Sequence, residues 1–219
     1  MPEQPHQRPE DDHIHIESPP AETALPSWEP EGQPGALTVR CGDPLQPPLA
    51  CYALGVLEDV QGHGVAEPGR EVGGVLLGQF VHASRGPLAR VDDMIIADSD
   101  QASRTHVTFT HTCWQRIHRE LEQRDDAAQI VGWYHTHPGF GPFLSAQDLF
   151  IQENFFSHPL HVALVFDPVQ SLFASFGWLA GQVVRADGCY IWAPGTDVAD
   201  LSVFMQTVKY SAKSQNATR

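Results

Sequence analysis

The sequence predicts an α+β fold (α/β mixed), in which a central, mostly antiparallel β-sheet is flanked by a few helices. Two features support this class. Apolar runs of strand length, bounded by turn residues, recur along the chain, and amphipathic stretches with helical spacing lie between them. The length of 219 residues suits one domain with extensions and is sufficient to bury a substantial core.

The expected elements follow in chain order. Strands are expected at residues 36–41, 71–81, 88–96, 106–110, 131–137, 161–166, 172–178 and 183–192. Helices are expected at residues 49–60, 111–124, 145–156 and from residue 196 onward. Pro47 and Pro48 would start the first helix, and Gly62 and Gly64 would end it. The polar stretch 98–105 is expected to be a loop.

The chain is expected to have three parts. Residues 1–35 hold eight prolines and eight acidic residues against one basic residue, Arg8. Such a segment buries too little apolar surface to offset its ordering entropy. We therefore expect a disordered, acidic, Pro-rich tail over residues 1–35 and a folded domain over residues 36–195. A C-terminal helix with a frayed end is expected over residues 196–219.

Composition excludes several classes of protein. The formal net charge of −14 argues against a nucleic-acid partner, because phosphate binding requires a basic face. The sequence shows neither a signal-peptide core nor an apolar run long enough to span a membrane. The four cysteines are far apart, which fits a reducing compartment better than a disulfide framework. We expect a cytoplasmic protein that binds neither nucleic acid nor membrane.

Residues 131–148 (VGWYHTHPGFGPFLSAQD) carry the strongest chemical signal. An apolar strand ends in His135 and His137, and alternate strand side chains share one face, so both imidazoles can reach one ion. Prolines and glycines at 138–142 then impose a compact turn, and the helix pattern that follows places Asp148 in its first turn. Two imidazoles and one carboxylate, with the fourth position left to water, form the ligand set of a catalytic zinc.

Simpler interpretations compete with a metal site. Ser145 and Asp148 have the spacing of a helix capping box, and buried strand histidines are often only hydrogen-bonded core residues. The combination of His-x-His, a rigid turn and a carboxylate in the next helical turn favours the metal site. The other histidines with possible site geometry are expected at the surface or an edge: His106, His111, His118, His158 and His161.

Other metal-dependent hydrolases fit less well. A metallo-β-lactamase requires His-x-His-x-Asp-His, but position 139 is Gly. An amidohydrolase barrel requires eight β/α units, for which this chain is too short. A zinc deaminase requires Pro-Cys-x-x-Cys, which is absent from the sequence.

These residues resemble a known family. The spacing His-Thr-His, seven residues, Ser145, two residues, Asp148 is the full H-[ST]-H-x7-S-x2-D pattern of the JAMM (JAB1/MPN+) zinc metalloproteases. The upstream glutamate of that motif, which opens a glycine-rich strand, is matched by Glu71. The resemblance covers roughly residues 49–178.

Two segments indicate where the chain lies within the family. Residues 132–141 and 166–171 look particularly like the proteasome-lid deubiquitinases. Pro142 and Phe143 replace the usual Cys-Trp, which bears on how a substrate is gripped. The acidic tail is closer to what we expect of a bacterial member encoded beside ubiquitin-like conjugation factors.

The resemblance implies a fold and a set of roles. It implies a single MPN-like domain with a cytidine-deaminase-like layout. His135, His137 and Asp148 would hold one catalytic Zn²⁺. Glu71 would take a proton from water and deliver it to the leaving amine, and Ser145 would hydrogen-bond the oxyanion.

The resemblance also implies an activity. It indicates a zinc-dependent isopeptidase that hydrolyses the bond between the C-terminal glycine of a ubiquitin-like protein and a target lysine. Ubiquitin-like proteins or their conjugates would be partners, and E1- or E2-like conjugation factors are candidates. Phe140 and Phe143 are candidate substrate contacts, although packing of the turn onto the core is an equal expectation for both.

Two alternatives stay open. The first is a peptidase that processes a ubiquitin-like or sulfur-carrier precursor to expose its terminal glycine. The second is a non-catalytic MPN scaffold, which would be marked by loss of Glu71 or of a metal ligand. Neither loss occurs in this sequence.

Overall fold

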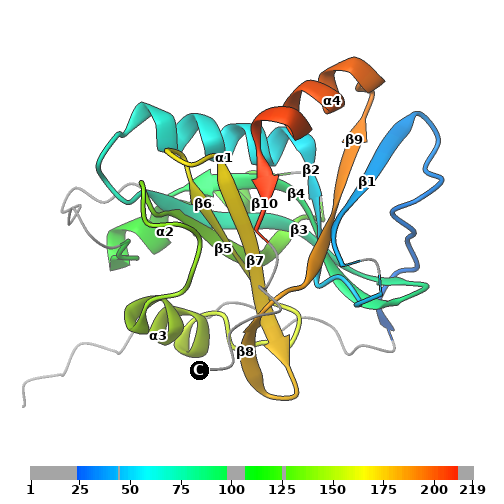
Figure 1. Cartoon of the computed structure of the whole chain (residues 1–219). Helices are drawn as coiled ribbons and strands as arrows, with labels where there is room; N and C mark the ends of the chain where they lie inside the picture. Colours follow the sequence, from blue (N-terminus) through cyan, green and yellow to red (C-terminus); the bar gives the residue numbers. More distant parts are fainter. Residues whose placement is uncertain (1–23, 44, 98–106, 125–126, 212–219) are drawn as a thin grey trace, which may run out of the picture.

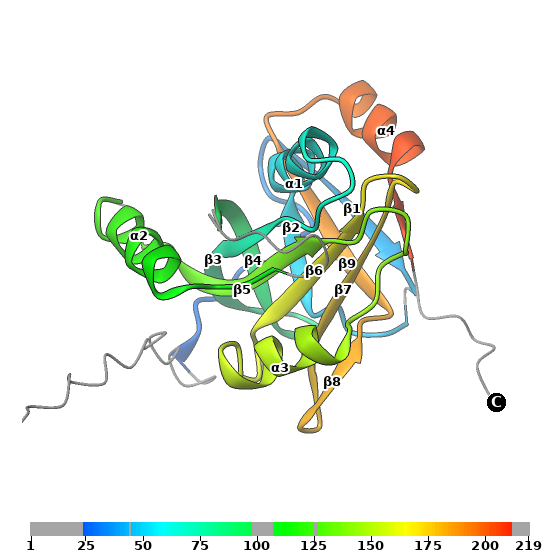
Figure 2. The same ribbon diagram turned by 90° about the vertical axis from the view of Figure 1, so that its left-hand side faces the viewer.

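One mixed β-sheet carries the fold, and helices cover both of its faces (Figures 1 and 2). This computed structural model describes residues 24–43, 45–97, 107–124 and 127–211. Its strands are β1 (Ala36–Gly42), β2 (Ala50–Ala53), β3 (Gly73–Ala83), β4 (Gly86–Ile96), β5 (Gln129–Thr136), β6 (Val162–Asp167), β7 (Leu172–Leu179), β8 (Gln182–Arg185), β9 (Gly188–Pro194) and β10 (Lys209–Tyr210). Its helices are α1 (Leu54–Ala66), α2 (His111–Glu122), α3 (Ala146–Asn154) and α4 (Val198–Thr207).

The strand order is β1-β9-β2-β4-β3-β5-β6-β7-β10, with β8 paired to β7. The central strand β3 is antiparallel to β4 and β5, and β5 is parallel to β6. One face of the sheet packs against α1 and α4 through residues such as Leu57 and Phe204. The other face packs against α2 and α3 through residues such as Trp114 and Ile151. The predicted α+β class is confirmed.

The first predicted helix, at residues 49–60, is wrong at both ends. Its first part forms β2, a fully buried strand that pairs in parallel with β4 and β9. The helix begins only at Leu54 and continues past Gly62 and Gly64 to Ala66. A Cβ at Gly64 would lie 3.0 Å from Thr136 Cγ2, so this glycine permits close packing of α1 on the end of β5 instead of ending the helix.

Three smaller predictions also differ from the structure. Residues 107–110 form no strand; instead Thr110 caps α2, and its side chain accepts a hydrogen bond from Cys113 N at 3.2 Å. The single strand expected at 183–192 is divided into β8 and β9, and β10 was not predicted. His161 is buried, with 3% of its surface exposed, because β6 is an interior strand. The predicted loop 98–105 and His106 lie outside the described residues.

The part of the predicted tail that the structure describes is packed on the domain. Ser27 forms a bridge with His82, and the Trp28 amide donates to His82 O at 3.1 Å. The Trp28 ring meets Trp192 edge to face, at 5.6 Å between centroids. Residues 1–23 lie outside the described part, so disorder there and the boundaries at 35 and 195 stay predictions. None of the described helices is long and apolar enough to cross a membrane.

Candidate metal centre

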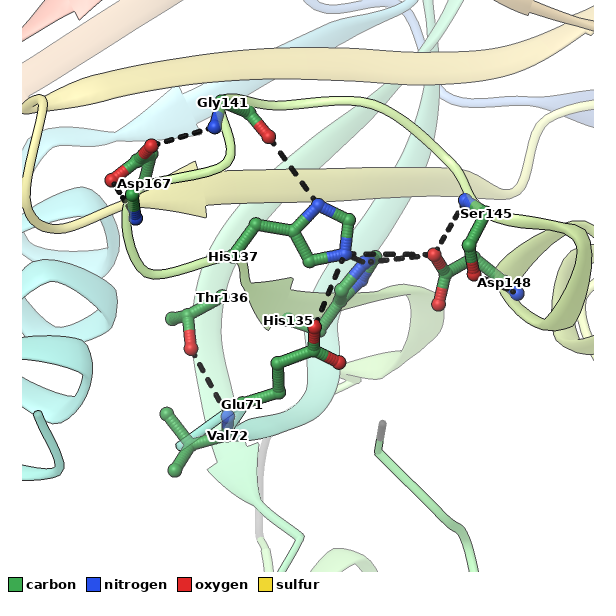
Figure 3. Close-up of polar contacts among 10 residues, drawn as sticks. Glu71, Val72, His135, Thr136, His137, Gly141, Ser145, Asp148 and Asp167 are labelled. Carbon is green, nitrogen blue, oxygen red and sulfur yellow. Dashed lines mark hydrogen bonds and ion pairs between the residues drawn. The ribbon is translucent and has the colours of Figure 1, made fainter. Parts of the chain in front are cut away.

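The centre is built at the C-terminal end of β5, an interior strand between β3 and β6. His135 and His137 project toward the face covered by α3, and Thr136 between them projects toward α1 (Figure 3). The Trp133 ring stacks on His135, with centroids 4.6 Å apart and an interplanar angle of 12°. The His137 amide continues the ladder by donating to Phe166 O at 2.8 Å. The stacking therefore orients the His135 imidazole, and the ladder positions the backbone of His137.

Asp148 reaches the histidines from the first turn of α3 while serving in the predicted capping box. Its amide donates to Ser145 Oγ at 3.2 Å, and its Oδ2 accepts from the Ser145 amide at 2.7 Å. The same Oδ2 lies 3.4 Å from His135 Nε2 and 3.6 Å from His137 Nε2. The capping interpretation and the ligand interpretation therefore describe the same arrangement, because the cap holds the carboxylate against the imidazoles.

The three donor atoms have the spacing that a tetrahedral zinc requires. The two Nε2 atoms are 3.1 Å apart, and each faces Asp148 Oδ2. With Zn–N and Zn–O bonds of about 2.0–2.1 Å, two ligand atoms of a tetrahedral site lie about 3.3 Å apart. All three side chains are buried. His135, His137 and Asp148 therefore form a group that could hold a metal ion.

The pKa shifts of His135 and Asp148 favour the forms that bind a metal, whereas that of His137 does not. Burial lowers the pKa of His135, which keeps that imidazole neutral. Burial also acts to raise the pKa of Asp148, but hydrogen bonds with His135, His137 and Ser145 outweigh it and hold the pKa below its usual range. Burial also acts to lower the pKa of His137, but the hydrogen bond with Asp148 and the charges of Glu71 and Asp148 outweigh it and raise that pKa. A cation at His137 would therefore compete with a proton, because only the neutral imidazole binds a metal.

Glu71 lies two residues before β3, and its carboxylate faces the same group of donor atoms. Its Oε1 lies 3.9 Å from His137 Nε2, and its side chain is mostly buried, with 13% exposed. Burial, and secondarily the charge of Asp148, raise the pKa of Glu71 to about 7, although His137 opposes this shift. A carboxyl group with such a pKa can both accept and release a proton near neutral pH.

Thr136 holds the chain next to Glu71, a role that the sequence did not reveal. Its Oγ1 accepts from the Val72 amide at 3.0 Å, and its own amide donates to Val72 O at 2.8 Å (Figure 3). The residue between the two histidines therefore fixes the main chain that carries the glutamate. The pattern H-[ST]-H contained the signal, since both allowed side chains carry a hydroxyl.

The two phenylalanines proposed as substrate contacts lie in different settings. Phe140, in the turn after His137, is 74% exposed. Phe143 is 45% exposed, and its ring centroid lies 4.5 Å from that of His137. Phe143 therefore packs against a proposed ligand, while Phe140 presents its ring to solvent. Contact of either side chain with a substrate stays a prediction.

The fold and this donor set define an MPN-type domain with a His-x-His and Asp metal group. Residues 54–158 match the family described as JAB1/Mov34/MPN/PAD-1 ubiquitin protease. This match extends over just under half of the chain and supports its assignment as a member of the JAMM/MPN family.

Individual relatives agree with this assignment. The chain is 38% identical over 110 residues to uncharacterized protein F37A4.5 of Caenorhabditis elegans, covering 47% of this chain and 31% of that protein. It is 35% identical over 112 residues to ubiquitin carboxyl-terminal hydrolase RPN11 of Saccharomyces cerevisiae, covering 50% and 35%. The chain thus spans about a third of the length of these curated relatives. A solution structure of protein DSY2949 from Desulfitobacterium hafniense shares the fold, with a TM-score of 0.50, 16% identity and coverage of 68% and 96%.

Proposed function

We propose that this protein is a zinc-dependent isopeptidase that hydrolyses the bond between the C-terminal glycine of a ubiquitin-like protein and a target lysine. The observation that carries the proposal is the convergence of His135, His137 and Asp148 on one point, with the Glu71 carboxylate 3.9 Å from His137 Nε2. Zinc supplies Lewis acidity when bound, lowering the pKa of a coordinated water from about 15.7 to about 7.

Glu71 is the proton carrier in this proposal. Its carboxylate would accept a proton from the attacking water at Oε1 and return it to the lysine amine that leaves. In the metal-free site the pKa of about 7 leaves neither protonation state of Glu71 strongly favoured at neutral pH. A bound cation would shift this balance toward the carboxylate, which is the form that accepts the proton. The hydrogen bonds between Thr136 and Val72 keep this carboxylate close to the donor group.

Ser145 would stabilise the oxyanion that develops on the scissile carbonyl. In the capping box its Oγ accepts a hydrogen bond from the Asp148 amide, so the hydroxyl hydrogen can still donate to a substrate oxygen. The residue also lies at the N-terminus of α3, where the helix dipole favours negative charge. Capping and oxyanion binding are thus compatible in one side chain.

Two arguments support the substrate class: the chemistry of a glycine-terminated tail and the sequence similarity to an RPN11 relative. A glycine-terminated extended tail can approach a buried site that bulkier side chains could not enter, and it can add to a sheet edge. Phe140 and Phe143 are exposed, and the Phe143 ring lies beside that of His137; both side chains would contact the tail or the body of the ubiquitin-like protein. An RPN11 relative is itself named a ubiquitin carboxyl-terminal hydrolase. An E1- or E2-like partner stays a prediction from the resemblance.

A Glu71→Gln variant tests the proposal. Zinc-loaded wild type should cleave lysine-linked diubiquitin, used here as the probe, whereas the variant should bind one zinc and lose turnover by about 10²- to 10⁴-fold. Zinc content by elemental analysis and initial rates by gel densitometry measure both quantities. Glu153→Gln, an exposed glutamate on α3, is the matched control and should retain both.

The outcomes separate the alternatives. If Glu71→Gln cleaves as fast as wild type, Glu71 is not the proton carrier. Wild type that binds zinc but cleaves only a linear ubiquitin fusion would be a precursor-processing peptidase. Wild type that binds no zinc would be a scaffold.

A further inference from the structure

Asp167, at the C-terminal end of β6, has a fully buried carboxylate that accepts four backbone hydrogen bonds. Its Oδ1 accepts from the amides of Gly139, Val169 and Gln170 at 2.9, 2.9 and 3.0 Å. Its Oδ2 accepts from the amide of Gly141 at 2.7 Å (Figure 3). A buried charge is tolerated only when it is paired or hydrogen-bonded, and here backbone dipoles supply that stabilisation.

These bonds join two turns that are distant in sequence. Val169 and Gln170 belong to the turn between β6 and β7, while Gly139 and Gly141 belong to the turn that follows His137. Both glycines have positive φ, +85° and +76°, so that turn depends on left-handed backbone. The Gln170 side chain adds a bond from Nε2 to Gly139 O at 3.1 Å. These hydrogen bonds, called the clasp below, hold the turn after His137 against the end of β6.

The clasp reaches the proposed metal centre through one peptide group. The Gly141 amide donates to Asp167, and the Gly141 carbonyl oxygen lies 3.3 Å from His137 Nδ1 (Figure 3). If Nδ1 carries the proton that this carbonyl accepts, the lone pair of His137 is on Nε2, the atom that faces His135 and Asp148. Partners of this kind fix the tautomer and the ring orientation of a metal-binding histidine.

We propose that Asp167 is a positioning residue for the metal centre: by holding Gly141, it fixes the carbonyl that orients the His137 imidazole and selects its Nε2 lone pair. This inference rests on the proposed function, because it assigns His137 as a ligand. The competing explanation is that Asp167 only stabilises two surface turns. The two explanations differ in what a partial loss of the clasp does to metal affinity.

Asp167→Asn is the sharpest variant that the geometry offers. The asparagine oxygen can take the place of Oδ1 and keep the bonds from Gly139, Val169 and Gln170. Its amide nitrogen then replaces Oδ2, cannot accept a hydrogen bond, and faces the Gly141 amide. The substitution therefore removes the link to His137 and leaves most of the clasp in place.

The experiment measures zinc affinity by chelator competition and amide exchange of Gly141 in the metal-free protein. For Asp167→Asn we expect zinc affinity to fall about 10-fold and exchange at Gly141 to accelerate selectively. The Co²⁺-substituted protein should also show a shifted d–d absorption spectrum, which reports ligand geometry. Asp197→Asn is the matched control: Asp197 caps α4 by accepting the Asp200 amide at 2.9 Å, and this variant should leave all three readouts unchanged.

A measurement on the wild type keeps the inference testable if the variant folds poorly. At about pH 8, ¹⁵N NMR of the metal-free protein should find the His137 proton on Nδ1; a proton on Nε2 would overturn the inference. Unchanged zinc affinity in a folded Asp167→Asn variant would also overturn it and leave Asp167 a structural residue. Wild type that binds no zinc would refute the proposed function instead, while the tautomer and the exchange at Gly141 would still decide the positioning role.

Discussion

Histidines are buried near both ends of the parallel strand pair β5 and β6, but their surroundings are opposite in kind. At the C-terminal end, His135 and His137 face the carboxylates of Asp148 and Glu71. At the N-terminal end, His161 packs among aromatic rings, 5.7 Å from both Phe80 and Phe156 between centroids. Neither ring nitrogen of His161 has a hydrogen-bond partner among the described residues.

The difference shows what turns a buried histidine into a ligand candidate. Burial, reinforced by neighbouring His158, lowers the pKa of His161 to about 4, so this ring is neutral at pH 7. The interactions that shift its pKa include no carboxylate. At the other end, burial also disfavours the charged imidazole of His135, but Asp148 opposes that effect and supplies a third donor atom. The carboxylate, not the burial, distinguishes the two ends.

The largest expected effect tests this distinction directly. His137→Ala should weaken zinc binding by more than about 100-fold, because loss of a ligand should exceed the 10- to 100-fold cost of changing an outer-shell partner. His161→Phe should bind zinc as wild type does, since the rings that His161 contacts (Phe80, Phe156 and His158) are not among the proposed ligands. Chelator competition on the two purified variants gives both constants.

The same two variants can refute the claim that only the end with His135 and His137 binds zinc. Equal losses of zinc affinity in His137→Ala and His161→Phe would mean that the two histidine clusters act on one centre. Circular dichroism of both variants is needed beside the titrations, since a shared loss of fold would otherwise imitate that result.

Lowering the pH should reduce the free energy of unfolding of the metal-free protein through His161, which lies at the aromatic end of the strand pair. The unfolded His161 has a pKa of about 6.5, whereas burial lowers the folded value to about 4. Above about pH 6.5 the ring is neutral in both states. As the pH falls from about 6.5 to 4, the unfolded state binds the proton more tightly, and the free energy of unfolding should drop by on the order of 3 kcal/mol.

Urea unfolding in the presence of a chelator, at several pH values across this window, measures the effect. Comparing wild type with His161→Phe cancels the titration of the metal centre, and the phenylalanine variant should lose less stability on acidification. His82→Phe, an exposed position on β3, serves as the control and should follow wild type. Parallel curves for wild type and His161→Phe would contradict the assignment of His161 as a buried neutral residue.

The sequence was most informative where the chemistry is local. His135 and His137 alternate at the end of one strand. Asp148 follows after a short Pro/Gly turn, in the first turn of the next helix, so the spacing predicted that the three side chains converge. Glu71 came from the family resemblance, since nothing in its own neighbourhood indicated that β3 lies beside β5. The role of Asp167 was not predicted, because the amides it binds at Gly139 and Gly141 are 28 and 26 residues away.

The failures have the same physical origin. β2 lies between β4 and β9, which are distant in sequence, and its four buried residues show no alternation that could mark a strand. His161 was expected at the surface or an edge, but it directly precedes β6, and the pairing of β6 between β5 and β7 buries it. Long-range pairing, which local patterns do not encode, decided both cases.

The smallest predicted effect concerns Thr136, which lies between His135 and His137 at the C-terminal end of β5, called the polar end below. Thr136→Val preserves shape but leaves the Val72 amide without its acceptor, which should cost about 1–3 kcal/mol of unfolding free energy. Because that amide follows Glu71 directly, kcat on diubiquitin should also fall while zinc affinity stays unchanged. Urea unfolding, initial rates and chelator competition separate the three quantities.

Thr136→Ser is the matched control, since it keeps the hydroxyl acceptor and removes only the methyl group that packs toward Gly64. It should retain kcat close to wild type and lose less stability than Thr136→Val. If the valine variant instead lost zinc affinity and kept the kcat of the zinc-loaded protein, Thr136 would act on the histidines beside it. The polar end would then depend on Thr136 for its ligands, and the hydrogen bond to Val72 would not govern the placement of Glu71.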